Sequence, residues 1–99
     1  MSHVISHINK AFDHRIRLGI MSVLMVNEWI EFTTMKELLE VTDGNLASHI
    51  KALEQEEFIV VTKQFVGKKP NTRYAATTAG KQAFEQHLNA LEQLIKQSR

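Results

Sequence analysis

Apolar residues recur every three or four positions in several stretches of the chain, the spacing that places them on one face of a helix. The first stretch, which predicts a short helix, contains Ile5, Ile8 and Phe12. The second follows Asp13, which is expected to be its N-cap. Its apolar positions are Ile16, Ile20, Val23 and Leu24. Gly19 lies within it, and because glycine costs about 1 kcal/mol relative to alanine inside a helix, we expect a close packing contact there.

Two closely spaced helices are expected after a short β-prone segment, WIEF at residues 29–32. Thr34 and Glu37 have the S/T-x-x-E spacing of a capping box, which predicts that the first of these helices begins at Thr34. Its inward-facing residues are expected to be Met35, Leu38 and Leu39. It ends at a turn formed by residues 42–44, and the next helix starts almost at once and extends to about residue 57.

The sequence FIVVTKQFVG, residues 58–67, is rich in β-branched and aromatic residues and predicts a strand. KKPN, residues 68–71, is expected to form a turn, and the residues that follow form the returning strand. Thr77 or Thr78 then caps a final helix. The apolar residues of that helix are spaced as in a two-heptad seam, and they are Phe84, Leu88, Leu91 and Ile95.

This order of elements predicts a single domain, residues 1–99, with a mainly α fold and one small β-hairpin (α+β). With 43% apolar and 23% charged residues, the composition is that of a globular protein and excludes intrinsic disorder. The absence of cysteine excludes disulfides and thiolate metal sites. No apolar run is long enough to span a membrane and the N-terminus lacks the features of a signal peptide, so we expect a cytoplasmic protein with no membrane partner.

Residues 34–57 have the helix-turn-helix pattern, in which a few residues that include a glycine join two helices. On a helical wheel of the second helix, the apolar residues Leu46, Ile50 and Leu53 lie within roughly 60° of one another. The opposite face carries Gly44, Ser48 and Lys51, flanked by Asn45, Ala47 and Ala52. The first two turns therefore present small and polar groups, whereas the acids gather at the far end of the helix.

A small, polar and basic helix face permits close approach to another macromolecule. Asn45 and Ser48 can hydrogen-bond base edges or phosphates, and Lys51 can neutralise a phosphate or reach a guanine. The helix N-terminus adds backbone N–H groups and a partial positive charge. Gly44 serves either the turn or the close approach; alternatively, the helix start simply tolerates glycine because Thr42 or Asp43 caps it.

Charge is unevenly distributed along the chain, although the net charge is only +1. Residues 28–57 carry eight acids and two bases, whereas residues 58–84 carry no acid. The bases of the second segment are Lys63, Lys68, Lys69, Arg73 and Lys81. A block of one sign indicates a field that attracts an anion, and the alternative is a solvated hairpin whose charges keep an exposed edge soluble. Beside a helix-turn-helix, DNA contact is the favoured interpretation.

With these motifs assembled, the sequence resembles the winged-helix transcriptional regulators of the MarR/ArsR-like type, in particular their small single-domain branch. The likeness rests on T-x-G-N-L-x-x-H-x-x-x-L-E before a strand, a basic turn, and T-x-x-G before the last helix, and it spans Phe12 to Ile95. It implies a helix-turn-helix at about 34–57, a wing at about 58–77 and a C-terminal dimerisation helix at about 78–97. It also implies that the second helix of the motif reads the major groove and that the wing contacts the backbone or the minor groove.

The candidate DNA-binding residues are Gly44, Asn45, Ala47, Ser48, Lys51, Lys68, Lys69 and Arg73. Arg15 and Arg17, at the start of the second helix, are candidates for further phosphate contacts. The candidate homodimer residues are Ile5, Ile8, Phe84, Leu88, Leu91 and Ile95. The alternative is that the last helix packs only on its own domain, but a helix of about 20 residues is about 30 Å long, more than so small a domain covers. No cofactor is expected, and nothing in the sequence supports a small-molecule or metal effector.

The five histidines include one pair with a spacing typical of metal ligands, His3 and His7 at i and i+4 on the expected first helix. His14 lies nearby, and His87 lies on the last helix. Because no cysteine assists them, these residues are interpreted as neutral surface or interface histidines, and no metal site is expected. His49 lies at the edge of the apolar stripe, where we expect it to pack or to bond the backbone rather than contact a base.

Catalysis finds little support in the sequence. Ser48 and His49 are adjacent, so on a helix they point about 100° apart and cannot form a nucleophile–base pair. The sequence therefore predicts a non-enzymatic, sequence-specific double-stranded DNA-binding transcriptional regulator that acts as a homodimer. The alternative is a winged-helix protein–protein docking module that does not bind DNA. Acids or large apolar groups on the recognition face would favour that alternative, and the face has neither.

Overall fold

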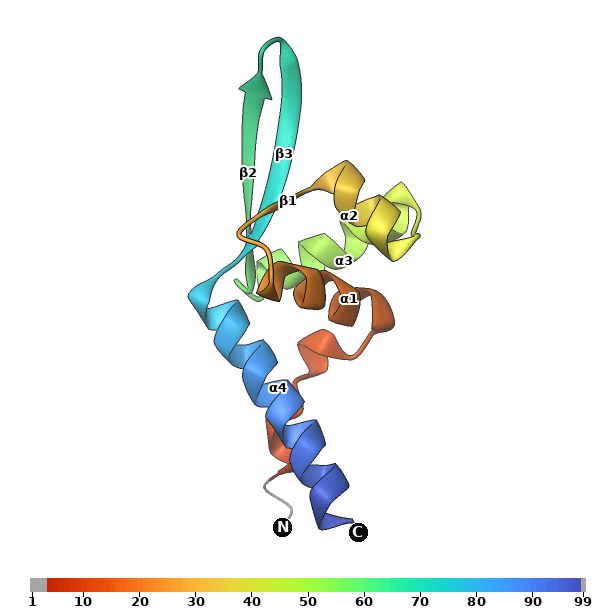
Figure 1. Ribbon diagram of the computed structural model, residues 1–99, viewed down its shortest axis with the longest axis vertical. Coiled ribbons are helices and arrows are strands. Elements are labelled where there is room, and N and C mark those ends of the chain that lie inside the picture. The colour runs from red at the N-terminus through yellow and green to blue at the C-terminus, as the bar shows by residue number, and fades with distance from the viewer. Residues whose placement is uncertain (1–3, 99) are drawn as a thin grey trace.

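The computed structural model describes residues 4–98 and contains four α-helices and a three-stranded antiparallel sheet (Figure 1). The helices are α1 (Arg15–Met25), α2 (Phe32–Leu39), α3 (Asp43–Gln55) and α4 (Thr78–Gln97). The strands are β1 (Ile30–Glu31), β2 (Ile59–Val66) and β3 (Lys69–Ala76), in the order β1-β3-β2. This architecture confirms the predicted α+β winged-helix fold, with β2 and β3 as the wing. None of the helices described is long and apolar enough to cross a membrane.

One apolar core lies between the first three helices, the base of the sheet and the first half of α4. Phe12, just before α1, is central to it: the centroid of its ring lies 5.3 Å from that of Phe58 and 5.2 Å from that of Phe84. The largest fully buried side chains are Phe12, Ile20, Met21, Leu24, Met35, Leu46 and Leu53. Because burying each contributes about 1.5–3 kcal/mol, this core fixes how α3 lies on α1 and α2.

The close contact expected at Gly19 is confirmed. A Cβ atom at this position would lie 2.8 Å from Cδ2 of Leu39, so α1 and α2 approach each other where the glycine leaves room. Glu40 then ends α2 in the left-handed conformation, with φ of 54°. The prediction that Leu38 faces inward is wrong, because its side chain is exposed on the outer side of α2.

The helix α2 begins two residues before the predicted capping box. Phe32 is its first residue and Glu31 is its N-cap, without a side-chain capping bond, so Thr34 lies inside the helix. The reason is tertiary, because β1 pairs with β3 and the chain passes from that strand directly into α2. The expected β-prone segment is confirmed as this short strand.

The N-terminal segment departs from the predicted short helix. It forms two separate 3₁₀ turns, η1 (Ile5–His7) and η2 (Lys10–Phe12). Asn9 interrupts them, because its side chain accepts a hydrogen bond from the backbone N–H of Ala11 at 2.8 Å. The backbone N–H of Asn9 donates to Nδ1 of His87 at 3.0 Å, which ties this break to α4.

The N-caps of α1 and α4 are both side chains that accept a backbone N–H. His14, rather than the predicted Asp13, caps α1 by accepting from Ile16 at 3.1 Å. Thr77 caps α4 by accepting from the N–H of Gly80 at 2.9 Å, which confirms one of the two predicted threonines. Both caps fix the direction in which their helix leaves the preceding segment.

The wing is a regular hairpin whose turn differs from the prediction. Val66 pairs with Lys69, so the turn consists of Gly67 and Lys68 rather than residues 68–71. Gly67 has φ of 65°, a conformation that suits glycine in a two-residue hairpin turn. Pro70 lies within β3 beyond the two residues that pair with β1, so its missing N–H leaves no bond to β1 unmade.

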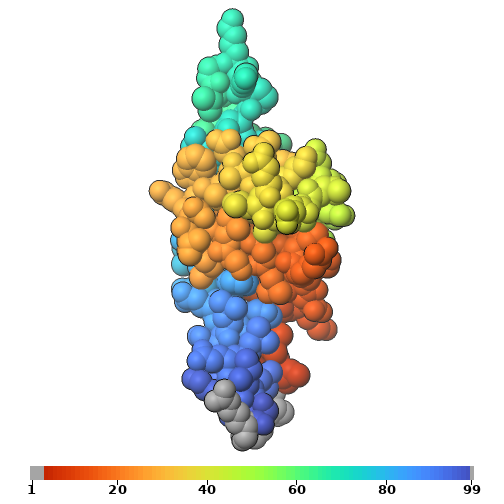
Figure 2. Space-filling view, turned by 45° about the vertical axis from the view of Figure 1, so that its right-hand side comes forward, coloured from red at the N-terminus to blue at the C-terminus, as the bar shows by residue number. Residues whose placement is uncertain are grey.

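The molecule is elongated, with principal extents of 55 × 25 × 21 Å. The wing projects from one end, and the C-terminal half of α4 forms the other (Figure 1). Figure 2 shows the wing as a narrow projection above the body formed by the helices. The tip of the wing, which is predicted to contact DNA, and the C-terminal half of α4, which is predicted to form the dimer, therefore lie far apart.

Candidate nucleic-acid interface

The second helix of the helix-turn-helix, α3, begins with a threonine cap. The side-chain oxygen of Thr42 accepts a hydrogen bond from the backbone N–H of Asn45 at 3.2 Å. Gly44 is in regular helical conformation, and a Cβ atom on it would meet nothing within 4 Å. The explanation that Gly44 forms the turn between α2 and α3 is therefore wrong, because the left-handed residue between these helices is Glu40.

The outer face of α3 carries the small and polar residues that the helical wheel predicted. Its exposed residues in the first turns are Gly44, Asn45, Ala47, Ser48 and Lys51. Asp43 is the one acid at this end of the helix, and its carboxylate is paired with Nζ of Lys36 at 2.8 Å. An anion that approaches this face therefore meets a carboxylate that already has a cationic partner.

A groove of about 750 Å³ separates α3 from the base of the wing. Lys51 of α3 lines one wall, and Lys63 of β2 lines the opposite wall. Glu54 of α3, Val61 and Tyr74 also line the groove, and Tyr74 is buried. The structure thus brings together a lysine of α3 and a lysine of the wing that are twelve positions apart in the sequence.

Lys68 and Lys69 are exposed at the tip of the wing, as the sequence predicted for its basic residues. Arg73 lies elsewhere, in the middle of β3 at the base of the wing rather than at the start of the returning strand. Its guanidinium carbon lies 3.6 Å from the ring centroid of Trp29, and its Nε donates to Oδ1 of Asn71 at 3.2 Å. Arg73 is therefore held at the wing base and is not a free cation at the tip.

The contact of Trp29 with Arg73 was not anticipated from the sequence. The two residues are far apart in the chain and meet because β1, next to Trp29, pairs with β3. The amide oxygen of Gln64, when turned toward the guanidinium, accepts from it at 3.1 Å. Arg73 of β3 is thus held on one side by Trp29, next to β1, and on the other by Gln64 of β2.

A group of two histidines and an arginine links α1 to α3. The rings of His14 and His49 stack with centroids 4.0 Å apart, and Nε of Arg17 donates to Nδ1 of His49 at 3.1 Å. Arg17 also donates to the backbone oxygen of Ala11 at 3.3 Å, so it is half-buried and tied, whereas Arg15 is exposed. His49 packs as expected, but its bond goes to a side chain instead of the backbone.

The environment of His49 disfavours its protonated form. Burial is the main cause that lowers its pKa, and the charges of His14 and Arg17 lower the pKa further. The hydrogen bond from Arg17 requires a lone pair on Nδ1, which agrees with a neutral ring. This histidine therefore anchors α3 through its neutral form.

The other histidines are His3, His7 and His87. His87 is buried rather than at a surface, and burial lowers its pKa while the charge of Asp13 raises it. His7 lies in a 3₁₀ turn, and His3 lies outside the described residues. Within residues 4–98, no three His, Asp or Glu side chains are placed to hold a metal ion together.

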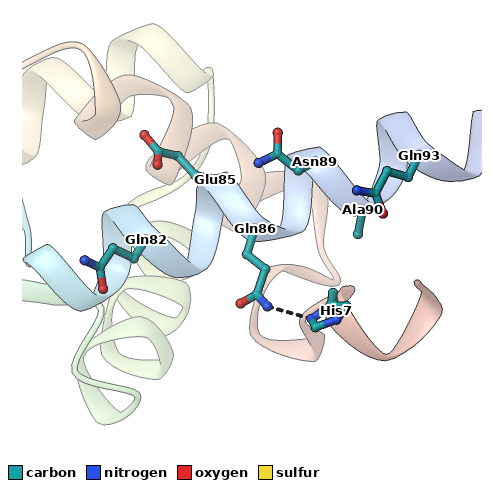
Figure 3. Close-up of a pocket in the computed structure, with 7 residues that line it drawn as sticks. All are labelled: His7, Gln82, Glu85, Gln86, Asn89, Ala90 and Gln93. Carbon is teal, nitrogen blue, oxygen red and sulfur yellow. Dashed lines mark hydrogen bonds between the residues drawn. The ribbon is translucent and has the colours of Figure 1, made fainter. Parts of the chain in front are cut away.

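A shallow pocket of about 530 Å³ lies between α4 and η1. It is lined mainly by amide side chains and one carboxylate: Gln82, Glu85, Gln86, Asn89 and Gln93, with His7 and Ala90. Figure 3 shows Gln86 pointing toward His7, whose Nδ1 lies 2.6 Å from the amide nitrogen. The contact between His7 and Gln86 holds the N-terminal segment against α4 at this pocket.

The candidate dimer residues divide into two groups. Phe84 is buried in the core of its own domain, so it is not part of a free surface. Leu88, Leu91 and Ile95 are 44%, 38% and 59% exposed, and they form an apolar stripe along the C-terminal half of α4. Ile5 is also exposed, whereas Ile8 is partly covered.

Several known proteins are similar to this chain in sequence or in architecture. The uncharacterized protein MJ0432 of Methanocaldococcus jannaschii is 34% identical over 87 residues, which are 88% of this chain and 95% of that protein. The transcriptional regulator homologue of Pyrococcus horikoshii OT3 has a TM-score of 0.87 at 27% identity, over 97% of this chain and 96% of that one. The fold is shared with YusO of Bacillus subtilis, with a TM-score of 0.78 at 15% identity, over 98% of this chain and 71% of that one. The sequence model of the family described as winged helix DNA-binding domain matches residues 16–95. The chain therefore belongs to this family of winged-helix DNA-binding domains.

Proposed function

We propose that this protein is a sequence-specific transcriptional regulator that binds double-stranded DNA as a homodimer. The observation that carries the proposal is the exposed, small and basic face of α3 beside a basic wing, with Lys51 and Lys63 on opposite walls of one groove. Neutralising phosphates supplies most of the affinity of such a surface, and contacts to base edges supply specificity. The proposed action requires no catalysis and no cofactor.

In this proposal α3 enters the major groove with its N-terminal turns foremost. Asn45, Ser48 and Lys51 contact base edges and nearby phosphates, while Gly44 and Ala47 let the backbone approach closely. Lys68 and Lys69 hold the DNA backbone from the wing, and Arg73 at the wing base contributes a more distant positive charge. Arg15 is exposed and adds a phosphate contact, whereas Arg17 acts indirectly by holding His49.

The homodimer forms through the apolar stripe of Leu88, Leu91 and Ile95, with Ile5 and Ile8 at its margin. Support comes from the exposure of three large apolar residues in a row on a 20-residue helix. Two recognition helices spaced about 34 Å apart would then read the two half-sites of a pseudo-palindrome. The name of the Pyrococcus horikoshii homologue agrees with a regulator.

The first experiment is fluorescence anisotropy with a labelled random-sequence duplex of about 30 base pairs, titrated at several salt concentrations. We expect binding that weakens steeply with salt, by about 0.9 logarithmic units per phosphate contact for each logarithmic unit of salt. Replacing both Lys68 and Lys69 with glutamate should weaken binding to every duplex, and Lys10→Glu, an exposed lysine far from the wing, is the control. Absence of wild-type binding at about 50 mM salt would contradict the proposal.

Specific recognition is tested by selecting a tight-binding duplex from a random pool. Lys51→Ala should cost about 1–3 kcal/mol on that duplex and much less on a random one. Equal losses on both duplexes would assign Lys51 to phosphate contact alone. The alternative of a protein-docking module predicts no binding to either duplex, and the lack of acids and large apolar groups on the exposed face of the first turns of α3, apart from the paired Asp43, disfavours it.

A further inference from the structure

The outer half of the wing carries an aromatic side chain that packing does not explain. Phe65, near the end of β2, is 74% exposed, although aromatic side chains usually bury most of their surface. Its partner across the hairpin is Pro70 of β3, so the two apolar rings lie on the same face of the wing. Neither residue belongs to the core, and both lie one pair away from the residues that flank the hairpin turn. Figure 2 shows that the wing projects from the body of the molecule.

The strand alternation determines which face of the wing this is. Side chains two positions apart on a strand share a face, so Phe65 lies on the same side as Lys63 and Val61. Both of those residues line the groove next to α3. The two apolar rings therefore extend the face of the wing that is turned toward α3, about 7 Å beyond Lys63.

The charge around these rings indicates what they contact. Lys63 lies two positions before Phe65 on the same face, Lys68 lies in the turn, and Lys69 pairs with Val66 on the opposite face. No acid occurs between residues 58 and 84, and the acid that lines a hollow together with Pro70 is Glu31, next to the base of the wing. An apolar protein surface would gain nothing from the lysines at the two ends and on the back of this apolar pair, whereas a groove with phosphates on both rims and sugars between them matches both features.

We propose that Phe65 and Pro70 form an apolar wedge that packs against the sugars and base edges of the DNA minor groove. This proposal rests on the proposed function, because it presupposes that α3 lies in the adjacent major groove. Lys63 on the same face and Lys68 in the turn hold phosphates at the two ends of the wedge, and Lys69 reaches a phosphate from the opposite face of the wing. The wing then reads the width and deformability of the minor groove, and the sites it prefers are steps that open easily and lack the guanine 2-amino group.

The affinity test compares two truncations at the same end of the wing. Phe65→Ala removes the wedge, whereas Val66→Ala removes an apolar side chain that is 56% exposed and points to the opposite face. We expect Phe65→Ala to weaken duplex binding about tenfold with an unchanged salt slope, because the interaction that this variant lacks is apolar. Val66→Ala should stay within about twofold, and Phe65→Leu should restore part of the affinity. Thermal melting of each variant checks that the fold is kept.

The groove test uses duplexes in which inosine replaces guanine, with cytosine retained. This exchange removes the 2-amino group from the minor groove and leaves the major-groove atoms unchanged. Wild-type protein should bind the inosine duplex several-fold more tightly, and Phe65→Ala should lose this preference.

Two results would overturn the wedge while leaving the proposed function intact. One is DNA binding by Phe65→Ala that equals that of wild type, which would assign the apolar face to a protein partner. The other is an inosine preference that Phe65→Ala retains. Failure of wild-type protein to bind any duplex would instead remove the proposed function on which the wedge rests.

Discussion

The α carbon of Gly80 lies directly against the backbone carbonyl of Phe58, and a methyl group on residue 80 would overlap that oxygen atom. Two hydrogen bonds hold the same junction: the backbone N–H of Thr77 donates to the oxygen of Phe58 at 3.0 Å, and its hydroxyl donates to the oxygen of Glu57 at 2.7 Å. Glu57 has φ of 62°, which turns the chain from α3 into β2. The first turn of α4 is thereby fixed to the end of α3.

Gly80→Ala should lower the free energy of unfolding by about 1–3 kcal/mol, because backbone atoms that cannot rotate away occupy the space of the new methyl group. Urea denaturation of purified protein measures the change. Gly44→Ala is the matched control, since that position opens to solvent and alanine should raise stability by up to about 1 kcal/mol. Equal stability of Gly80→Ala and wild type would show that α4 shifts freely at this junction.

Trp29→Ala should loosen the base of the wing. The substitution removes the ring over which the Arg73 guanidinium lies, and an exposed cation–π contact contributes about 0.5–1 kcal/mol. Amide hydrogen exchange in the middle of β3 should become faster, while exchange in α1 should not change. Trp29→Phe keeps part of the ring and should give an intermediate rate. Unchanged exchange in β3 would mean that the Asn71 and Gln64 bonds alone hold the arginine.

Leu91→Glu should convert the proposed dimer to a monomer, because it places a charge in the middle of the apolar stripe on α4. Sedimentation velocity measures the oligomeric state directly. Leu38→Glu on α2 is a suitable control, since Leu38 is also an exposed leucine but lies outside the stripe. A Leu91→Glu protein that sediments as wild type would place the dimer interface elsewhere.

Stability should decrease as the pH falls below about 6.5. The pKa values of His49 and His87 are lowered in the folded state, so the unfolded chain binds more protons in the range between the lowered values and 6.5. By linkage, the free energy of unfolding is highest above that range and falls as the pH drops through it. Chemical denaturation at about pH 7.5 and about pH 5.5 measures the difference.

A variant separates the contribution of His87 from that of His49. His87→Asn keeps an acceptor for the N–H of Asn9 but cannot titrate, so its stability should change less between the two pH values than that of wild type. The two proteins are compared by their pH dependence, because the substitution also alters packing in the core. An identical pH dependence would show that His87 does not contribute.

Several parts of the fold that depend on local sequence could be predicted. The apolar positions of α3 and the identity of its outer face follow from helical periodicity, and the packing of Gly19 follows from the cost of glycine inside a helix. Thr77 caps α4 through a bond to a residue three positions ahead. In each case the determining interaction lies within a few residues or concerns one face of one element.

Several of the features that were predicted wrongly depend on pairings between distant segments, whereas the N-cap of α1 and the turn of the wing are local. The start of α2 is set by the pairing of β1 with β3, which overrides a good capping box. The N-terminal segment breaks into two turns at Asn9, where the local bond to Ala11 is joined by a bond from the Asn9 backbone N–H to His87 across the chain. Arg73 remains a candidate DNA-binding residue, but Trp29 contacts its guanidinium, and no local pattern signals that contact.

The elongated shape determines how a rotation at the apolar stripe of α4 displaces the wing. The apolar stripe and the wing lie at opposite ends of the longest axis, which measures 55 Å. In a dimer joined through the stripe, a rotation of one protomer about the stripe moves its wing tip furthest, because the tip lies at the opposite end of the molecule. A rotation too small to disturb the packing of three side chains on α4 is magnified into a displacement of the wings relative to the DNA. In the proposed dimer, the angle between the two protomers at the stripe therefore sets where the two wings meet the DNA.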